Sequence, residues 1–377
     1  MSRDVLDQLA AARPARLDPP PADVEGAVAA IVHAAPHSFH AAAPPVRSRR
    51  RVAVLASAGL TAAAAITGVA VVVTSGTVPT PGTSAGPSAA PRVLTAGQIL
   101  LAAAERSGAT TFGPGRYLVQ RNESGVLLQI DGGTDTYAML EKTSYATWLS
   151  RSGKDPNWAS SQRLGLTPAT PADAAAHQRH GSPRQVMVIK PVPGKKGPTS
   201  PVGTGPGEPF EERFGGSEVY AIGADNVTVA DLEKLPTDPA KLRAELLRHF
   251  RGGGGDLPTD RDEWLLVVGS SVVTGFPVSG QVRAAAYRMI ASLPGVRALG
   301  TVRDQRGRAG EAVAFTRSFG ANGAIEERLI IDPANGQGLA RESRVVKPGG
   351  STAWLEAGVL YSYELTLAVE TADTLPG

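Results

Sequence analysis

The chain has 377 residues, of which 42% are hydrophobic and 19% charged, so it can bury a sizeable core and is not disordered throughout. It has no cysteine, which excludes disulfide bonds, thiolate metal sites and a cysteine nucleophile. The net charge of only +3 and the aromatic content of 5% argue against nucleic-acid binding, and we expect no nucleic-acid partner.

Residues 1–51 are predicted to form a short cytoplasmic tail. Leu6 and Leu9 share one face of a short amphipathic segment that Pro14 ends, and a second such segment covers residues 23–33. Two pieces of this length cannot form a stable core alone, so the tail is expected to fold on a partner or to remain a passive tail. Leu6 and Leu9 are the candidate partner contacts.

Val52–Thr74 is predicted to be a transmembrane helix. The segment holds 23 residues without a charge, and about 20 apolar residues in a helix span the hydrocarbon core. A signal peptide would start nearer the N-terminus, and a buried core helix of this length would carry charges. Four arginines precede the segment directly and place the N-terminus in the cytoplasm: Arg47, Arg49, Arg50 and Arg51. We therefore expect a single-pass protein of the cell membrane, in contact with the lipid bilayer.

The part of the chain after the membrane segment is divided by composition. Residues 75–94 are rich in Pro, Gly, Ser and Thr and are predicted to be an extended linker. Residues 95–377 are expected to form an extracytoplasmic domain. Thr95 and Gln98 make a capping box, which predicts that a helix begins there. Apolar stripes predict three further helices, over 239–250, Trp264–Val273 and 282–293.

Alternation of apolar and polar residues predicts the strands of this domain. Pro191–Gly216 is predicted to be a surface loop, because it is dense in Pro and Gly. Strands, then helices, then strands predict an α+β fold, in which helices cover one side of an antiparallel sheet. The predicted strands are Arg116–Gln120, Val126–Ile130, Thr136–Glu141, Gln185–Lys190, Val296–Val302, Glu311–Thr316, Arg328–Ile331, Leu339–Val345 and Val359–Val369.

Histidine residues are the first candidates for metal chemistry. His33, His37 and His40 have the spacing H-x3-H-x2-H, which resembles the H-x3-C-x2-C zinc pattern of anti-sigma factors with histidine at both cysteine positions. A proline inside the triplet opposes the helix that would align the imidazoles, so no metal or cofactor is expected there. His177 and His180 have no obvious third ligand, and they are predicted to lie in a surface loop.

No catalytic constellation is found in the sequence, and we expect a protein without enzymatic activity. Gly269–Ser271 lacks the second glycine of a nucleophile elbow and lies in an apolar helical run. The triplets that start at Asn122 and Asn226 match N-glycosylation sequons, which often occur by chance. Glu326 and Glu327 are predicted to be exposed charges near a turn.

Several blocks of the chain resemble a family of uncharacterised actinobacterial single-pass membrane proteins. Members of this family tend to accompany genes for sigma factors, so the resemblance implies a regulatory role and a sigma factor as a partner of residues 1–51. The resemblance carries no catalytic motif and transfers no site. The blocks are Leu6–Pro19, the arginine-flanked membrane segment, Leu235–Leu247, Ser292–Val313 and Leu329–Glu342.

The C-terminal strands also resemble the half-barrels of envelope lipoprotein carriers, which bind acyl chains in the concavity of a sheet. The rhythm D-x-x-G-R…IDPxxG, with its aspartates at Asp304 and Asp332, carries this resemblance. Two functions stay open. The first is an envelope-sensing regulator whose tail contacts a sigma factor. The second is a membrane-anchored module that binds a lipid or another hydrophobic ligand, which an apolar groove in the sheet would favour.

Overall fold

The structure is a computed structural model, and it describes residues 94–109, 112–190, 197–216, 218–253 and 257–376. These residues form an α+β fold around a large antiparallel sheet, which confirms the predicted fold class. Within these ranges, no helix has both the length and the apolar character needed to cross a membrane. The predicted membrane segment Val52–Thr74 lies outside the described residues.

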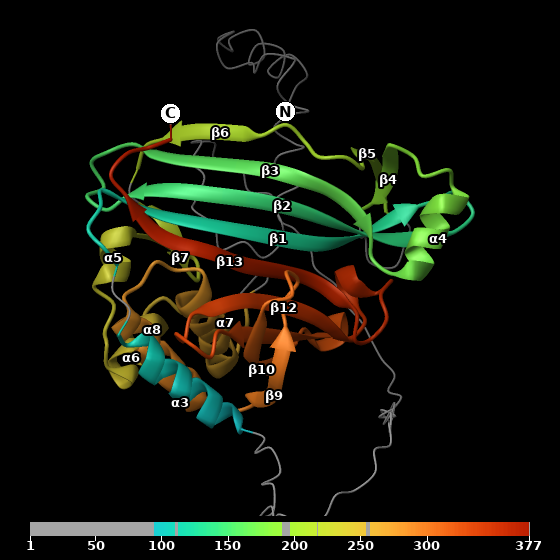
Figure 1. Cartoon of the computed structure of the whole chain (residues 1–377). Coiled ribbons are helices and arrows are strands. Elements are labelled where there is room, and N and C mark those ends of the chain that lie inside the picture. Colours follow the sequence, from blue (N-terminus) through green and yellow to red (C-terminus); the bar gives the residue numbers. More distant parts are fainter. Residues whose placement is uncertain (1–93, 110–111, 191–196, 217, 254–256, 377) are drawn as a thin grey trace, which may run out of the picture. The chain divides into compact units, whose positions relative to one another are not determined.

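The main sheet has the order β6-β3-β2-β1-β13-β12-β11-β10-β9, and its neighbouring strands are antiparallel. The last strand, β13, lies beside the first, β1, so the two ends of the domain meet in the middle of the sheet (Figure 1). A hairpin of β4 and β5 pairs with the end of β1, and β7 and β8 form a separate small sheet. The strands are β1 (Tyr117–Asp131), β2 (Thr136–Ser150), β3 (Asn157–Pro168), β4 (Gln185–Ile189), β5 (Thr199–Gly203), β6 (Phe210–Phe214), β7 (Glu218–Ile222), β8 (Asp225–Thr228), β9 (Arg297–Arg303), β10 (Ala309–Ser318), β11 (Ala324–Ile331), β12 (Gly338–Lys347) and β13 (Leu360–Ala372).

The helices gather in two places. Helices α3, α5, α6 and α8 lie at one end of the long strands, whereas α4 lies with β4 and β5 at the other end (Figure 1). The helices are α3 (Ala96–Ser107), α4 (Pro171–Arg179), α5 (Val229–Glu233), α6 (Pro239–Leu247), α7 (Arg261–Thr274) and α8 (Gly280–Ala291), with short 3-10 turns at Gly320–Asn322 and Gly350–Thr352. The predicted capping box of Thr95 and Gln98 starts α3, and Asp238 caps α6 as expected.

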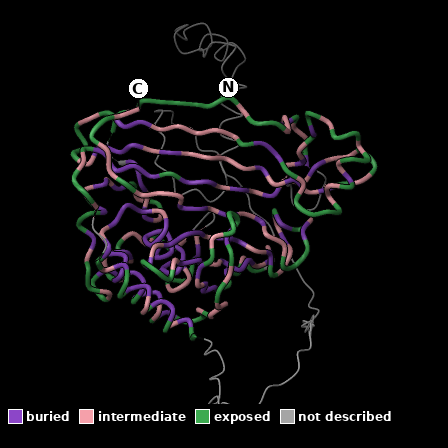
Figure 2. Tube along the Cα trace, viewed as in Figure 1, coloured by how far each residue is buried: buried purple, intermediate pink, exposed green. Residues whose placement is uncertain are grey.

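The largest core lies between the helices and the sheet. Helix α7 is buried along almost its whole length, in agreement with its apolar sequence on all sides. Leu100, Trp264 and Tyr287 are at most 1% exposed and pack in this core with residues of β10 and β11. Buried residues, purple in Figure 2, concentrate here. Each large apolar side chain buried in this way stabilises the fold by about 1.5–3 kcal/mol.

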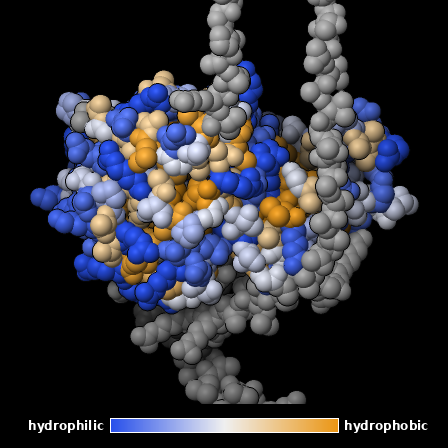
Figure 3. Space-filling model, turned by 90° about the horizontal axis from the view of Figure 1, so that it is seen from below, coloured by the Kyte–Doolittle hydropathy of each residue, from blue (hydrophilic) through white to orange (hydrophobic). Residues whose placement is uncertain are grey.

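Parts of the outer surface remain apolar. Viewed from below, apolar patches lie among hydrophilic areas (Figure 3). The large apolar side chains that stay exposed include Leu94, Leu101 and Phe210. Single exposed apolar residues of this kind are normal on folded domains, so they do not by themselves define a site.

The two faces of the sheet differ in what covers them. On the helical face, Gln120 donates a hydrogen bond to the carbonyl of Gly275 at the end of α7 (3.0 Å), and Thr366 donates to the carbonyl of Thr274 (2.9 Å). On the opposite face, Tyr363 donates to Glu123 (2.9 Å) beneath the loop 304–308 that joins β9 to β10. We call these the helical face and the loop face.

Two predictions about secondary structure are wrong in an informative way. The two strands predicted before and after residues 121–125 are one strand, β1, which pairs continuously with β2 through its polar middle. There Arg121 and Glu123 have charged partners on the loop face, Glu370 and Arg306. The predicted loop Pro191–Gly216 contains β5 and the exposed edge strand β6, and β3 was not predicted. Pro201 is tolerated in β5 because that strand has a partner on only one side.

Candidate functional site

The loop 304–308 is organised around a buried aspartate on the loop face. Asp304 is 5% exposed, and its carboxylate accepts hydrogen bonds from the backbone nitrogens of Arg306 (2.9 Å) and Arg308 (3.0 Å). The same carboxylate accepts a bond from Nε of Arg308 (2.6 Å). Gly307 closes the turn with φ of +77°, a conformation that favours glycine. The D-x-x-G-R pattern seen in the sequence is therefore a self-contained turn.

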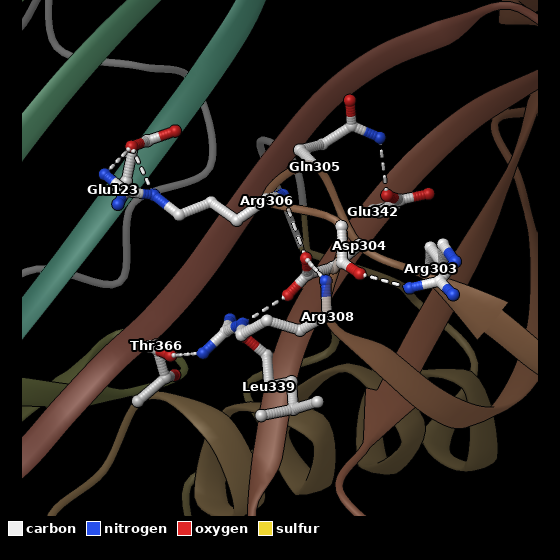
Figure 4. A network of polar contacts seen from close by, with 10 residues as sticks. Glu123, Arg303, Asp304, Gln305, Arg306, Arg308, Leu339, Glu342 and Thr366 are labelled. Carbon is white, nitrogen blue, oxygen red and sulfur yellow. Dashed lines mark hydrogen bonds and ion pairs between the residues drawn. The ribbon is translucent and has the colours of Figure 1, made fainter.

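Three side chains attach this turn to the sheet (Figure 4). Arg306 pairs with Glu123 of β1 (2.5 Å), and Gln305 donates to Glu342 of β12 (2.8 Å). Arg308 donates to the backbone carbonyls of Thr366 in β13 (2.9 Å) and of Leu339 in β12 (3.0 Å). Apolar side chains from β10 to β13 are fully buried on this face, among them Ile330, Ala340 and Leu365. We call the set Glu123, Asp304, Gln305, Arg306, Arg308, Glu342 and Tyr363 the loop cluster.

The members of the loop cluster satisfy one another. Glu123 is 5% exposed and accepts bonds from both Arg306 and Tyr363. Burial and the hydrogen bond to Glu123 raise the pKa of Tyr363, so its phenol remains a donor. The ring of Tyr363 lies over Gly125, where any larger side chain would collide with it. Since its charges and donors have partners within the protein, the loop cluster holds the loop to the sheet.

A second group of polar residues lies on the helical face of the same strands. Asn122 is directly opposite Tyr145 of β2 and Thr366 of β13, and residues opposite each other in antiparallel strands share a face. Tyr145 donates to Glu364 (2.5 Å), and Arg341 of β12 is directly opposite Glu364. Burial and the Glu364 carboxylate raise the pKa of Tyr145. We call this group the polar strip: Asn122, Ser124, Glu141, Thr143, Tyr145, Arg163, Arg341, Ser362 and Glu364.

The polar strip runs between the two regions that cover the helical face. On one side, Arg341 donates to the hydroxyl of Ser271 in α7 (3.0 Å). On the other side, Arg163 donates to the carbonyl of Gly203 at the end of β5 (2.6 Å) and lies 3.7 Å from Glu141. Beyond Arg163, apolar residues of α4, β4 and β5 cover the hairpin of β1 and β2. The strip is therefore bounded by α7 at one end and by β5 at the other.

Asn122 differs from the other polar residues of the central strands. The residue is only 6% exposed, and its amide makes no hydrogen bond to another described residue. Its amide atoms are not among the fully buried side-chain atoms that lack a partner, so they keep contact with solvent. Ser124, Thr143 and Ser362 of the same strip are half-buried, and their hydroxyls likewise make no hydrogen bond within the described part of the chain. The polar strip thus contains donors and acceptors that the protein itself leaves open.

The site residues predicted in the N-terminal part cannot be compared with the structure. Leu6, Leu9, the three histidines His33, His37 and His40, and the arginines Arg47, Arg49, Arg50 and Arg51 lie outside the described residues. They remain predictions from the sequence.

The predicted surface loop at His177 and His180 is wrong for His177, whereas His180 lies in the turn that ends α4. His177 lies in α4 and contacts the hydroxyl of Tyr137 (3.2 Å), whereas His180 caps α4 and lies 2.5 Å from Asp135. The ring of Tyr137 also stacks on His180. These contacts fix α4 against the hairpin of β1 and β2. The two histidines therefore have a structural role in the packing of α4.

The prediction for Glu326 and Glu327 is also wrong. Both lie in β11 and are buried, on opposite faces of the sheet. Glu327 pairs with the buried Arg317 (2.9 Å), and Glu326 pairs with Arg297 and Arg328. Arg317 of β10 and Arg297 of β9 offset part of the cost of burying these carboxylates, and these partners from other strands are not visible from local sequence.

Two other sequence motifs have a structural explanation. Ser270 and Ser271 lie inside α7, where their hydroxyls donate to backbone carbonyls four residues earlier. The sequon at Asn122 lies in the middle of β1 and is nearly buried, so attachment of a glycan there is incompatible with this fold. The run Arg121–Ser124 inside an apolar pattern was the signal that could have identified both polar groups.

Neither a protein-family model nor a curated protein matches the chain. Among the described residues, no cluster of three or more His, Cys, Asp or Glu side chains could hold a metal ion. The function is therefore inferred from the geometry and chemistry of the polar groups.

Proposed function

We propose that the chain is a non-enzymatic, single-pass membrane protein whose C-terminal domain senses the cell envelope by binding a polar ligand at the polar strip. The observation that carries this proposal is the Asn122 amide, which belongs to a residue only 6% exposed, keeps contact with solvent and has no hydrogen-bond partner among the described residues. Such an amide is available to a ligand, whose own polar groups can replace its contact with water.

The sequence supports the membrane topology of this proposal. The uncharged segment Val52–Thr74 follows four arginines, and the linker 75–94 ends next to α3, which begins at Ala96. In the proposed arrangement the domain faces outward, and the tail, through Leu6 and Leu9, contacts a sigma factor in the cytoplasm. The family resemblance of the sequence supports that partner.

The second candidate function is binding of a lipid or another hydrophobic ligand, as in lipoprotein-carrier half-barrels. The apolar residues beneath the loop 304–308 favour it, because displacement of the loop would uncover them. In the described conformation, however, other residues of the domain bury Ile330, Ala340 and Leu365 fully, so no apolar surface is open to a ligand at these residues. The polar chemistry of the strip therefore supports recognition of a polar ligand more directly.

Adjacent residues of β2 provide a matched test of the proposal in cells. Thr143 lies in the polar strip, whereas Lys142 is directly opposite Gly125 on the loop face, and both are half-buried. A photo-crosslinking amino acid at position 143 should capture an envelope component after illumination of intact cells, and the same residue at position 142 should not. Equal capture at both positions, or capture at neither, would refute recognition at the strip.

A further inference from the structure

The chemistry of the polar strip restricts the class of ligand it can take. The strip contains the carboxylates of Glu141 and Glu364 and the guanidinium groups of Arg163 and Arg341, so its own charges cancel. Tyr145 donates to Glu364, and Glu141 lies 3.7 Å from Arg163. An anionic or cationic ligand would be attracted by two of these groups and repelled by the other two. The electrostatic potential of the strip therefore favours neither an anion nor a cation.

The groups left for a ligand are hydroxyls and one amide. Ser124, Thr143 and Ser362 each offer a donor and an acceptor, and the Asn122 amide offers both as well. An apolar ligand would bury these groups without partners, at about 1–3 kcal/mol for each. A ligand whose own groups both donate and accept would satisfy all of them.

The positions of these groups also restrict the shape of the ligand. They lie on three adjacent strands: Ser124 of β1 is directly opposite Thr143 of β2, whereas Ser362 of β13 is opposite Val126, two residues further along β1. Neighbouring strands are about 4.8 Å apart, so the three hydroxyls form an oblique row across the strands. A ligand with hydroxyl groups spread over a length of about 10 Å matches this row.

We infer that the polar strip binds a neutral, polyhydroxylated ligand, namely an oligosaccharide chain, with Asn122 as its central hydrogen-bonding residue. This inference rests on the proposed function and specifies the ligand of the same site. Arg341 and Tyr145 position Glu364 beside the chain, and Arg163 limits the strip at the β5 end. Asn122 is a binding residue and has no catalytic role.

The test uses the full chain in phospholipid nanodiscs and calorimetric titration. The neutral probes are maltotriose and the N-acetylglucosamine trimer, and the comparison probes are trigalacturonate, which is acidic, and oleate, which is apolar. Asn122→Leu removes the amide at similar volume, and Lys142→Ala is the matched control on the opposite face. We expect a neutral probe to bind, with affinity reduced about tenfold or more in Asn122→Leu and unchanged in Lys142→Ala.

The outcomes separate this inference from the proposed function. Binding of trigalacturonate or oleate alone, lost in Asn122→Leu, would overturn the neutral ligand class and leave recognition at the strip intact. Binding of a neutral probe that is equally strong in Asn122→Leu and wild type would overturn the role of Asn122. If none of the four probes binds and position 143 captures nothing in cells, both the inference and the proposed function are wrong.

Discussion

The loop cluster and the polar strip occupy opposite faces of the same strands, and their residues are often neighbours in the chain. Asn122 precedes Glu123, Arg341 precedes Glu342, and Tyr363 precedes Glu364, with the first and second of each pair on opposite faces. On the loop face, the buried carboxylates of Glu123 and Asp304 pair with arginines of the loop. On the helical face, Asn122 is left without a partner among the described residues.

This difference separates a structural role from a recognition role. A network whose members satisfy one another stabilises the conformation in which it forms, and removal of one member leaves the others unsatisfied. A polar group that contacts water rather than a protein partner contributes little to stability, so its replacement by an apolar side chain of similar size should be harmless to the fold. Substitutions in each of the two groups test this contrast.

The largest effect is expected at Asp304. Asp304→Ala removes the acceptor of two backbone bonds and of the Arg308 bond, and it should lower the free energy of unfolding by about 3 kcal/mol. Urea unfolding of the full chain can be followed by tryptophan fluorescence, because all four tryptophans lie in the C-terminal domain. Asp332→Ala is the control, since half-buried Asp332 accepts one such turn bond from Ala334. A similar loss for both variants would contradict the central role of Asp304.

A smaller effect is expected for the ion pair of Glu123 and Arg306. Glu123→Gln preserves an acceptor for Tyr363 but removes the charge, and Arg306 is 49% exposed, so solvent screens much of the pair. A double-mutant cycle with Arg306→Gln should give a coupling energy of about 1 kcal/mol, which decreases at high salt. A coupling near zero would show that the loop is held without this pair.

The polar strip should show the opposite behaviour. Asn122→Leu should change the free energy of unfolding by less than about 1 kcal/mol, because the amide that it removes has no hydrogen-bond partner among the described residues and keeps contact with solvent. The same urea titration measures this effect. A loss of more than about 2 kcal/mol would show that Asn122 has a structural partner and would remove the contrast between the two faces.

The smallest effect is expected at α4, away from both polar groups. The hydrogen bond with His180, and then that with Arg179, lower the pKa of the exposed Asp135. A carboxyl group with a lowered pKa stabilises the folded state above its ordinary pKa of about 4 and loses that contribution as the pH falls through the lowered value.

Hydrogen exchange of α4, corrected for intrinsic rates, should therefore increase as the pH is lowered below about 4. Asp135→Asn should remove this pH dependence and show faster exchange already at neutral pH. If the pH dependence of exchange is unchanged in Asp135→Asn, a different titrating group must cause it.

The sequence predicted the elements whose signals are local. The start of helix α3 was predicted correctly from its capping box, and helix α6 and the alternating strand β13 were predicted to within about three residues at each end. The middle of β1 was not predicted to be a strand, because its residues are polar on both faces and resemble the sequence of a turn. The strand β3 was missed since Ser160–Arg163 are half-buried without alternation.

The candidate site could not be predicted because its contacts connect distant parts of the chain. Glu123 and Tyr363 are 240 positions apart, and Tyr145 and Glu364 are 219 apart. No spacing rule relates such residues, and only the register of β1, β2 and β13 brings them together. The polar run from Arg121 to Ser124 was visible in the sequence, but its meaning depends on this register.

The most direct test of the account combines Asn122→Leu with the crosslinking residue at position 143. The measurement is the yield of captured envelope component in intact cells, normalised to the amount of folded protein. We predict that the yield falls about tenfold while the protein level and the unfolding free energy are maintained. An unchanged yield at full stability would contradict recognition through Asn122, and it would leave the polar strip as a surface without the proposed role.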